Sequence, residues 1–133
     1  APSGSGKSTL VQTLLKQKLP LAFSISATSR PPRGKEQDGI DYHFLSLKNF
    51  KKKIKENAFL EYEEVYPSKF YGTLRSELEK KWSDGQHIIF DVDVLGGLNI
   101  KSQYPEQTLA IFILFRVKIS KAFKATIGNS SVI

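Results

Sequence analysis

The first nine residues combine glycines, a lysine and hydroxyl side chains in a spacing that is typical of a phosphate-binding loop. Gly4 and Gly6 let successive backbone N–H groups turn toward phosphate oxygens. Lys7 can reach the terminal phosphates of a nucleotide, and the Ser8 hydroxyl can bind Mg²⁺. The complete motif begins with glycine, and Ala1 stands at that position, which is a mild substitution. The segment predicts a nucleotide-phosphate site, and the alternative is a flexible Gly/Ser-rich linker.

Two carboxylates end a later apolar segment, residues 87–93. Asp91 and Asp93 follow His87-Ile-Ile-Phe90, which predicts a buried strand. A carboxylate at the carboxyl end of such a strand suits Mg²⁺, so we expect Ser8 and Asp91 to bind this ion. Capping of the following helix is the alternative role for both aspartates.

The elements that position these residues are predicted to alternate between helices and strands. Helices are predicted over 9–16, 46–57, 74–82 and 94–104, and strands over 21–26, 40–45, 58–65, 69–73, 87–93 and 108–113. Leu10, Leu14 and Leu15 form the apolar stripe of the first helix. Ser46 is the expected cap of the second helix, and Leu47, Phe50 and Ile54 share one face of it.

Several longer segments can also be assigned. The strands over 21–26, 87–93 and 108–113 suit a parallel sheet, and residues 58–73 suit a hairpin with its turn at 67–68. The Pro- and Gly-rich segment 27–39 is expected to be an exposed loop because it is too polar to bury. Residues 115–119 alternate in the manner of a strand.

This pattern indicates an α/β fold, with a parallel sheet like that of phosphate-loop NTPases flanked by helices and a small mixed α+β insert. We expect residues 1–29 to form the core with the phosphate loop, residues 30–73 the insert, and residues 74–133 the continuation of the core. The chain begins inside a motif, contains no Met, and lacks the strand that should precede the loop. We therefore expect it to be truncated at both ends.

Composition limits the class of protein. The 133 residues are 40% hydrophobic, which is enough for a packed core. The chain has no Cys and only two His, so disulfides are excluded and a zinc site is not expected. No apolar run is long enough to span a membrane, and no signal-peptide pattern is present, so the cytoplasm is the expected location.

The net charge of +7 suits either nucleic acid or several phosphate groups. Five lysines lie in the segment 48–55, which predicts an amphipathic helix. Lysines distributed around such a helix usually form a solvated face, and a nucleic-acid patch is the alternative.

In order and spacing, residues 1–113 resemble guanylate kinases. Besides the phosphate loop, the resemblance rests on Ser26-Ala-Thr-Ser-Arg30-Pro-Pro-Arg33-Gly, Asp38-Gly-Ile-Asp-Tyr42-His-Phe, Phe59-Leu-Glu61, Phe70-Tyr71-Gly72-Thr73 and Phe90-Asp91-Val-Asp93. It implies direct transfer of the ATP γ-phosphoryl group to GMP, with Mg²⁺ as the cofactor. The expected partners are ATP and GMP, with dGMP as a further candidate acceptor, and neither nucleic acid nor a membrane is expected as a partner.

The resemblance also implies roles for individual residues. It assigns ATP binding to Ser3, Gly4, Ser5, Gly6, Lys7, Ser8 and Thr9. It assigns GMP binding to Ser26, Arg30, Arg33, Tyr42, Glu61, Tyr71, Thr73, Asp91 and Asp93. Lys7, Arg30 and Arg33 are the expected catalytic residues. Guanidinium groups and phenolic hydroxyls suit a dianionic phosphate, and Glu61 can accept hydrogen bonds from guanine N1–H and the exocyclic amine.

Two other functions fit parts of the sequence. Guanylate-kinase-like domains of scaffolding proteins recognise protein ligands, but they typically lose the phosphate loop, whereas Gly6-Lys7-Ser8 is intact here. A basic nucleic-acid binder would rest on charge alone, and its binding would depend on salt but not on nucleotide. The sequence does not indicate an oligomeric state.

Overall fold

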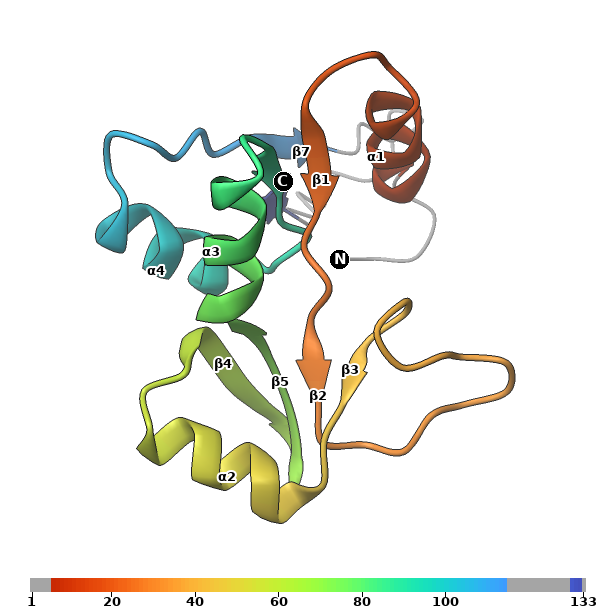
Figure 1. Cartoon of the computed structure of the whole chain (residues 1–133), viewed down its shortest axis with the longest axis vertical. Coiled ribbons are helices and arrows are strands. Elements are labelled where there is room, and N and C mark those ends of the chain that lie inside the picture. The colour runs from red at the N-terminus through yellow and green to blue at the C-terminus, as the bar shows by residue number, and fades with distance from the viewer. Residues whose placement is uncertain (1–5, 115–129, 133) are drawn as a thin grey trace, which may run out of the picture. The chain divides into compact units, whose positions relative to one another are not determined.

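The computed structural model describes residues 6–114 and 130–132. The chain forms two compact units, and Figure 1 shows the helices and strands of each. We call residues 1–19 together with 90–133 the terminal unit, and residues 20–89 the central unit. None of the helices in the described residues is both long and apolar enough to cross a membrane.

The central unit contains a mixed four-stranded sheet with the strand order β3-β2-β5-β4. Its strands are β2 (Ala27–Thr28), β3 (His43–Phe44), β4 (Phe59–Tyr66) and β5 (Lys69–Leu74). β2 pairs in parallel with β3 and antiparallel with β5, and β5 pairs antiparallel with β4. The predicted hairpin is therefore confirmed. In its turn, the backbone N–H of Ser68 donates a hydrogen bond of 2.7 Å to Glu64 Oε1.

The helix α2 (Leu47–Lys55) packs against this sheet because its apolar residues recur on one face. Phe50 is fully buried and stacks on Phe59, with the ring centroids 4.3 Å apart. The core also contains Ala27, Phe70 and Leu74, with Leu45, Leu47 and Ile54 packed against it. The Ser46 side chain accepts a hydrogen bond from the Asn49 backbone N–H, so the predicted helix cap and buried face are confirmed.

The prediction of an exposed loop over 27–39 is wrong at its beginning. Ala27 and Thr28 are fully buried and form β2. Thr28 Oγ1 donates a hydrogen bond of 3.0 Å to the Phe70 carbonyl and accepts one from the Arg30 backbone N–H. A buried hydroxyl with both roles satisfied carries little desolvation penalty, so this polar residue can lie inside the sheet. Residues 31–35 are exposed as predicted.

A second, two-stranded sheet in the central unit pairs β1 (Leu21–Phe23) in parallel with β6 (His87–Ile89). Both strands are shorter than predicted, but their parallel pairing is confirmed. α3 (Arg75–Ser83) contacts β6 and β5. His43 Nε2 lies 2.8 Å from Glu77 Oε1, so a polar contact joins β3 to α3.

The terminal unit contains the helices α1 (Lys7–Leu15) and α4 (Val94–Gln103), both close to their predicted positions. The predicted leucine stripe of α1 is not its buried face. The buried residues are Lys7 and Val11, one helical turn apart, and 43% of the Leu10 surface is exposed.

The expected third parallel strand is also wrong. Strand β7 covers only Phe112–Leu114 and pairs antiparallel with β8 (Ser130–Val132). Before β7, Lys101 Nζ donates hydrogen bonds of 2.6 Å to the carbonyls of Pro105 and Thr108. The Thr108 carbonyl therefore accepts a hydrogen bond from a side chain, whereas in a strand it would accept one from a neighbouring strand. The predicted strand over 115–119 lies outside the described residues.

Candidate nucleotide sites

The phosphate-loop sequence leads directly into α1. Gly6 precedes the helix with φ +74°, a left-handed conformation that glycine adopts without strain. The first intrahelical hydrogen bond joins the Leu10 N–H to the Gly6 carbonyl at 2.9 Å. Because the first N–H groups of a helix have no intrahelical partner, this end of α1 attracts anions. Ser3, Gly4 and Ser5, which were predicted to complete the loop, lie outside the described residues.

Lys7 is held beside a carboxylate of the same unit. Its surface is only 7% exposed, and its Nζ forms an ion pair with Asp91 Oδ1. Asp91 follows the end of β6 by two residues, because this strand is shorter than predicted, and its side chain is partly exposed. The ion pair gives Lys7, the first residue of α1, a fixed position.

The predicted magnesium ligands, Ser8 and Asp91, both belong to the terminal unit. Ser8 is exposed at the start of α1, and the Asp91 carboxylate is partly accessible. Hydroxyl and carboxylate oxygens are ligands that Mg²⁺ prefers, and this ion commonly takes its remaining ligands from water and substrate phosphates. Within the described residues, no group of three or more acidic, His or Cys side chains could hold a metal alone. The donor set therefore fits Mg²⁺ bound together with a nucleotide.

Asp93 has a structural partner in this arrangement. Its carboxylate accepts a hydrogen bond of 2.7 Å from the Gly96 backbone N–H and so caps α4. Helix capping was the alternative reading of both aspartates, and Asp93 adopts it. Asp91 instead pairs with Lys7.

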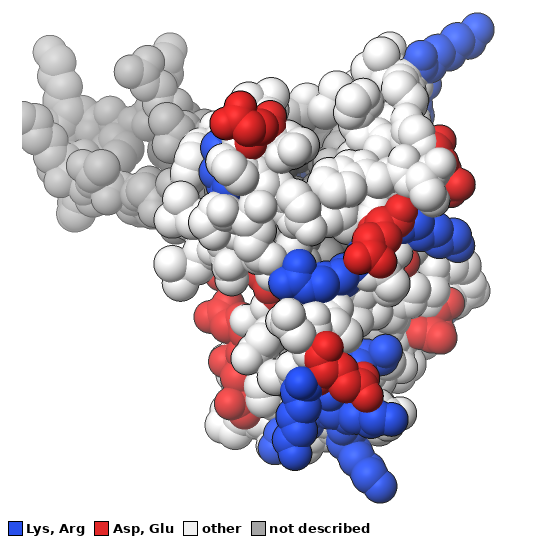
Figure 2. Space-filling view, turned by 60° about the vertical axis from the view of Figure 1, so that its left-hand side comes forward, with Lys and Arg blue, Asp and Glu red and all other residues white. Residues whose placement is uncertain are grey.

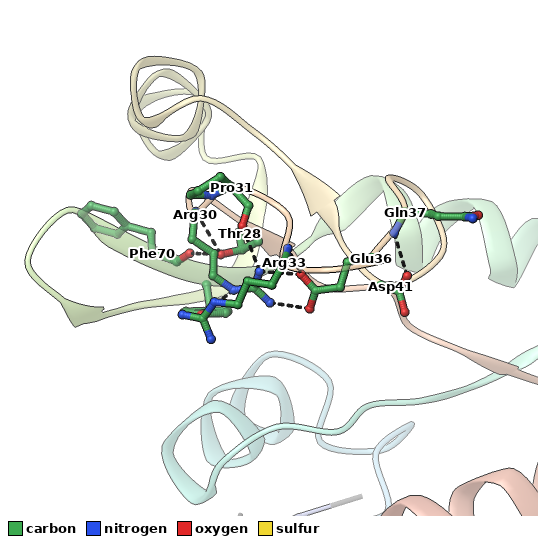
Figure 3. A network of polar contacts seen from close by, with 9 residues as sticks. Thr28, Arg30, Pro31, Arg33, Glu36, Gln37, Asp41 and Phe70 are labelled. Carbon is green, nitrogen blue, oxygen red and sulfur yellow. Dashed lines mark hydrogen bonds and ion pairs between the residues drawn. The ribbon is translucent and has the colours of Figure 1, made fainter.

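The central unit places a buried arginine at the end of β2, as Figure 3 shows. Arg30 is only 5% exposed, and its guanidinium forms a two-point contact with the Glu36 carboxylate at 2.7 and 2.8 Å. It also donates to the Pro31 carbonyl at 3.0 Å and to the Tyr71 hydroxyl at 3.1 Å. Glu36, followed by Tyr71, raises the pKa of Arg30 further above its already high value, against the effect of burial.

Aromatic rings frame this arginine. The Arg30 guanidinium carbon lies 4.9 Å from the centre of the Tyr42 ring and 5.7 Å from that of Phe44. The rings of Tyr42 and Tyr71 meet edge to face at 6.1 Å. The four Arg and Tyr residues predicted to bind the GMP phosphate are Arg30, Arg33, Tyr42 and Tyr71. The fold brings Arg30, Tyr42 and Tyr71 together from segments far apart in the sequence, and we call these three residues the phosphate cluster.

The predicted base-reading residues meet across the hairpin. Glu61 in β4 pairs in register with Thr73 in β5, and Thr73 Oγ1 donates a hydrogen bond of 2.6 Å to Glu61 Oε1. Tyr71 and Thr73 are two residues apart on one strand, so their side chains leave the same face of the sheet. The phosphate cluster and the Glu61–Thr73 pair therefore share a strand. Ser26, half-buried ahead of β2, contributes its backbone carbonyl to the His43 N–H at 2.9 Å.

Glu36 contacts both predicted arginines, although its role was not predicted from the sequence. Its carboxylate contacts the Arg30 guanidinium and accepts a hydrogen bond of 2.7 Å from the Arg33 backbone N–H. These contacts, Arg30 first, lower the pKa of Glu36 from 4.5 to about 2. A carboxylate three residues after the second arginine of a Pro-stiffened loop was the available signal.

The lysine-rich segment predicted as a helix forms α2. Lys48, Lys51, Lys52 and Lys55 are exposed around the helix. Figure 2 shows Lys and Arg side chains gathered at the lower end of the view, where α2 lies in Figure 1, with carboxylates among them. A solvated helix face stays the prediction for these lysines.

These two sites define a class of protein. A helix that begins at Gly-Lys-Ser-Thr beside a carboxylate is typical of phosphate-loop nucleotide-binding proteins. The positive charge of Arg30 and the hydroxyls of Tyr42 and Tyr71 beside it suit a second phosphate. The sequence profile of the family described as guanylate kinase matches residues 1–129, so the chain belongs to the guanylate kinase family.

Individual relatives agree with this assignment. The guanylate kinase of Bacteroides fragilis is 61% identical over 113 residues, which are 85% of this chain and 55% of that protein. The guanylate kinase of Porphyromonas gingivalis is 56% identical over 115 residues, or 86% of this chain and 61% of that protein. The chain therefore spans little more than half the length of these relatives.

A solved structure shows the same fold. The crystal structure of guanylate kinase from Anaplasma phagocytophilum superposes with a TM-score of 0.63 at 28% identity. The match covers 75% of this chain and 51% of that one. The expected α/β guanylate kinase fold is thereby confirmed.

Proposed function

We propose that the protein transfers the γ-phosphoryl group of ATP to GMP, giving ADP and GDP. The observation that carries the proposal is the cluster of Arg30, Tyr42 and Tyr71, which shares strand β5 with the Glu61–Thr73 pair. One part of this arrangement suits a phosphate, and the other suits the donor edge of guanine. Family membership supports both assignments.

In the proposed reaction, an oxygen of the GMP phosphate attacks the γ-phosphorus of ATP. The bond from that phosphorus to the β–γ bridging oxygen breaks, and ADP leaves with the electron pair. Such transfers depend on positioning and charge neutralisation and need no covalent enzyme intermediate.

The residues divide this work between donor and acceptor. At the donor, the N–H groups at the start of α1 and the Lys7 ammonium hold the ATP phosphates and neutralise their charge. Ser8 and Asp91 would hold Mg²⁺, which would supply further charge neutralisation. At the acceptor, Arg30, Arg33, Tyr42 and Tyr71 hold the GMP phosphate.

The base is selected at the hairpin. Glu61 accepts hydrogen bonds from the N1–H and amine groups of guanine, and Thr73 keeps its carboxylate in place. Adenine does not present this donor pair, so the proposal includes discrimination against AMP. Three further assignments stay predictions of the sequence. They are the additional contacts to GMP by Ser26, Asp91 and Asp93, the role of residues 30–73 as the GMP-binding insert, and a cytoplasmic location.

A coupled assay of ADP release tests the proposal, with ATP, Mg²⁺ and either GMP or AMP as the acceptor. We expect turnover with GMP and far less with AMP. Equal rates with both acceptors would contradict the guanine assignment. No turnover with GMP would favour a protein-interaction module, although the intact Gly6-Lys7-Ser8 sequence favours the kinase.

A further inference from the structure

The contacts of Arg30 leave it little capacity for a ligand. A guanidinium carries five N–H donors. Four are engaged: Nε with Tyr71, Nη1 with Pro31 and Glu36, and Nη2 with Glu36. One N–H, on Nη2, remains without a partner among these contacts. In this arrangement Arg30 cannot present a two-point fork to a phosphate.

Arg33 is in the opposite situation. It is exposed, and its guanidinium makes no hydrogen bond or ion pair within residues 6–114 and 130–132. Its backbone is fixed to Glu36: the Arg33 N–H donates a hydrogen bond to Glu36 Oε2, and the Arg33 carbonyl accepts one of 3.0 Å from the Glu36 N–H. Figure 3 shows the Glu36 carboxylate linked both to the Arg30 side chain and to the Arg33 backbone.

Glu36 thus has two roles in one loop. It occupies the fork of the buried arginine, and it fixes the backbone from which the exposed arginine extends. A second contact stabilises the loop further along, where the Gln37 N–H donates a hydrogen bond of 2.7 Å to Asp41 Oδ2. A loop fixed at two points loses less conformational freedom when it binds a ligand.

We propose that Glu36 is a positioning residue of the acceptor site: it holds Arg30 and the Arg33 backbone so that Arg33 supplies the fork that grips the GMP phosphate. This inference rests on the proposed function. Arg30 then contributes its charge, its one remaining N–H and the position of the Tyr71 hydroxyl. Glu36 itself does not touch the substrate, because a carboxylate would repel the phosphate.

The test compares Glu36→Gln with wild type by calorimetric titration of GMP, guanosine and ATP. Glutamine keeps the size of the side chain but replaces one carboxylate oxygen by an NH₂ group that would face a guanidinium donor. We expect GMP affinity to fall by roughly 10- to 100-fold. Guanosine lacks the phosphate, so its affinity should be unchanged, as should that of ATP.

Two further variants sharpen the comparison. Glu36→Asp keeps the charge on a side chain one methylene shorter, and it should recover part of the lost GMP affinity. Glu79→Gln removes a carboxylate from the exposed side of α3, so it controls for the change in net charge and should match wild type.

Unchanged GMP affinity in Glu36→Gln, with wild type binding GMP, would overturn the inference and leave the proposed function standing. An equal loss of GMP and guanosine affinity would also overturn it, because a merely structural residue would affect both. If wild type binds no GMP, both the proposed function and this inference fail.

Discussion

Thr73 Oγ1 donates a hydrogen bond of 2.6 Å to Glu61 Oε1 across the β4–β5 hairpin. The hydroxyl is buried with its strand, because Thr73 is only 1% exposed. The carboxylate is therefore held from one side by a fixed donor. This leaves Glu61 in a defined orientation for reading a base, and it makes the residue a test of specificity.

Glu61→Gln should weaken GMP binding without affecting ATP. The glutamine NH₂ would face a guanine donor, and such a buried mismatch costs roughly 2 to 3 kcal/mol. GMP affinity should fall by tens to hundreds of times in calorimetric titrations. Thr73→Val, which keeps the shape but removes the hydrogen bond to Glu61, should cause a smaller loss. A parallel loss of ATP and GMP binding would instead assign Glu61 to the support of the fold.

Gly72 lies between Tyr71 and Thr73 in β5, and it should not tolerate a side chain. A Cβ atom there would lie 2.7 Å from the Glu61 carbonyl oxygen and 2.8 Å from Tyr62 Cβ. The obstacle includes backbone, so Gly72→Ala should destabilise the protein by about 1 to 3 kcal/mol in denaturant unfolding and also weaken GMP binding.

Gly85→Ala is the matched control for this prediction. A Cβ at Gly85 would meet no atom within 4 Å, although its φ of +73° disfavours alanine. Gly85→Ala should lower the free energy of unfolding through backbone strain alone, and GMP binding should be unchanged. If Gly72→Ala binds GMP as tightly as Gly85→Ala does, the close approach at Gly72 does not support the site.

Local signals in the sequence predicted much of this fold. Ser46 and the spacing of Phe50 and Ile54 lie within one helix, so both the cap and the buried face of α2 could be read directly. The hairpin was equally legible, because β4 and β5 are separated by only residues 67–68.

The errors arose where a residue depends on distant partners. Burial of Thr28 depends on the Phe70 carbonyl, 42 residues away. The β7 strand pairs with residues 130–132, which no local pattern indicated.

The candidate site shows the same limit. The resemblance named Arg30 and Arg33 as equivalent, but the two-point contact with Glu36 depends on how the loop folds back on itself. The sequence could therefore name the arginines and could not divide their roles.

The pH dependence of stability should report the Glu36 contact. Its pKa is about 2 in the folded protein and 4.5 ordinarily, so the folded state favours the charged carboxylate. The stabilisation is fully present above the unfolded pKa and is lost as pH falls from about 4.5 toward 2.

Urea unfolding of wild type and Glu36→Gln between pH 7 and pH 2 should therefore give two stabilities that converge at the acid end. Glu79→Gln serves as the control for loss of one carboxylate. A difference between wild type and Glu36→Gln that stays constant down to pH 2 would show that the Arg30 contact does not govern this titration.

Lys7→Ala should reduce the rate of the chemical step more than it weakens nucleotide binding. It removes a charge that the proposal directs at the transferring phosphoryl group, so kcat should fall on the order of 100-fold or more. Single-turnover measurements with saturating ATP and GMP separate this step from binding. Because Lys7 is buried in an ion pair with Asp91, the thermal unfolding of the variant must be compared in parallel. Unchanged turnover would remove Lys7 from the mechanism.

Arg33→Lys should be nearly as harmful as Arg33→Ala. An ammonium group keeps the charge, but it cannot reproduce the planar fork that contacts two phosphate oxygens at once. The loss should appear in the KM for GMP, with the KM for ATP unchanged. Stability should hardly change in either variant, because the hydrogen bonds between Arg33 and Glu36 involve the backbone N–H and carbonyl of Arg33, which both substitutions retain. Tyr42→Phe gives the scale of losing one hydrogen bond to a charged group, about 1 to 2 kcal/mol. Full activity in Arg33→Lys would mean that the residue acts by charge attraction alone.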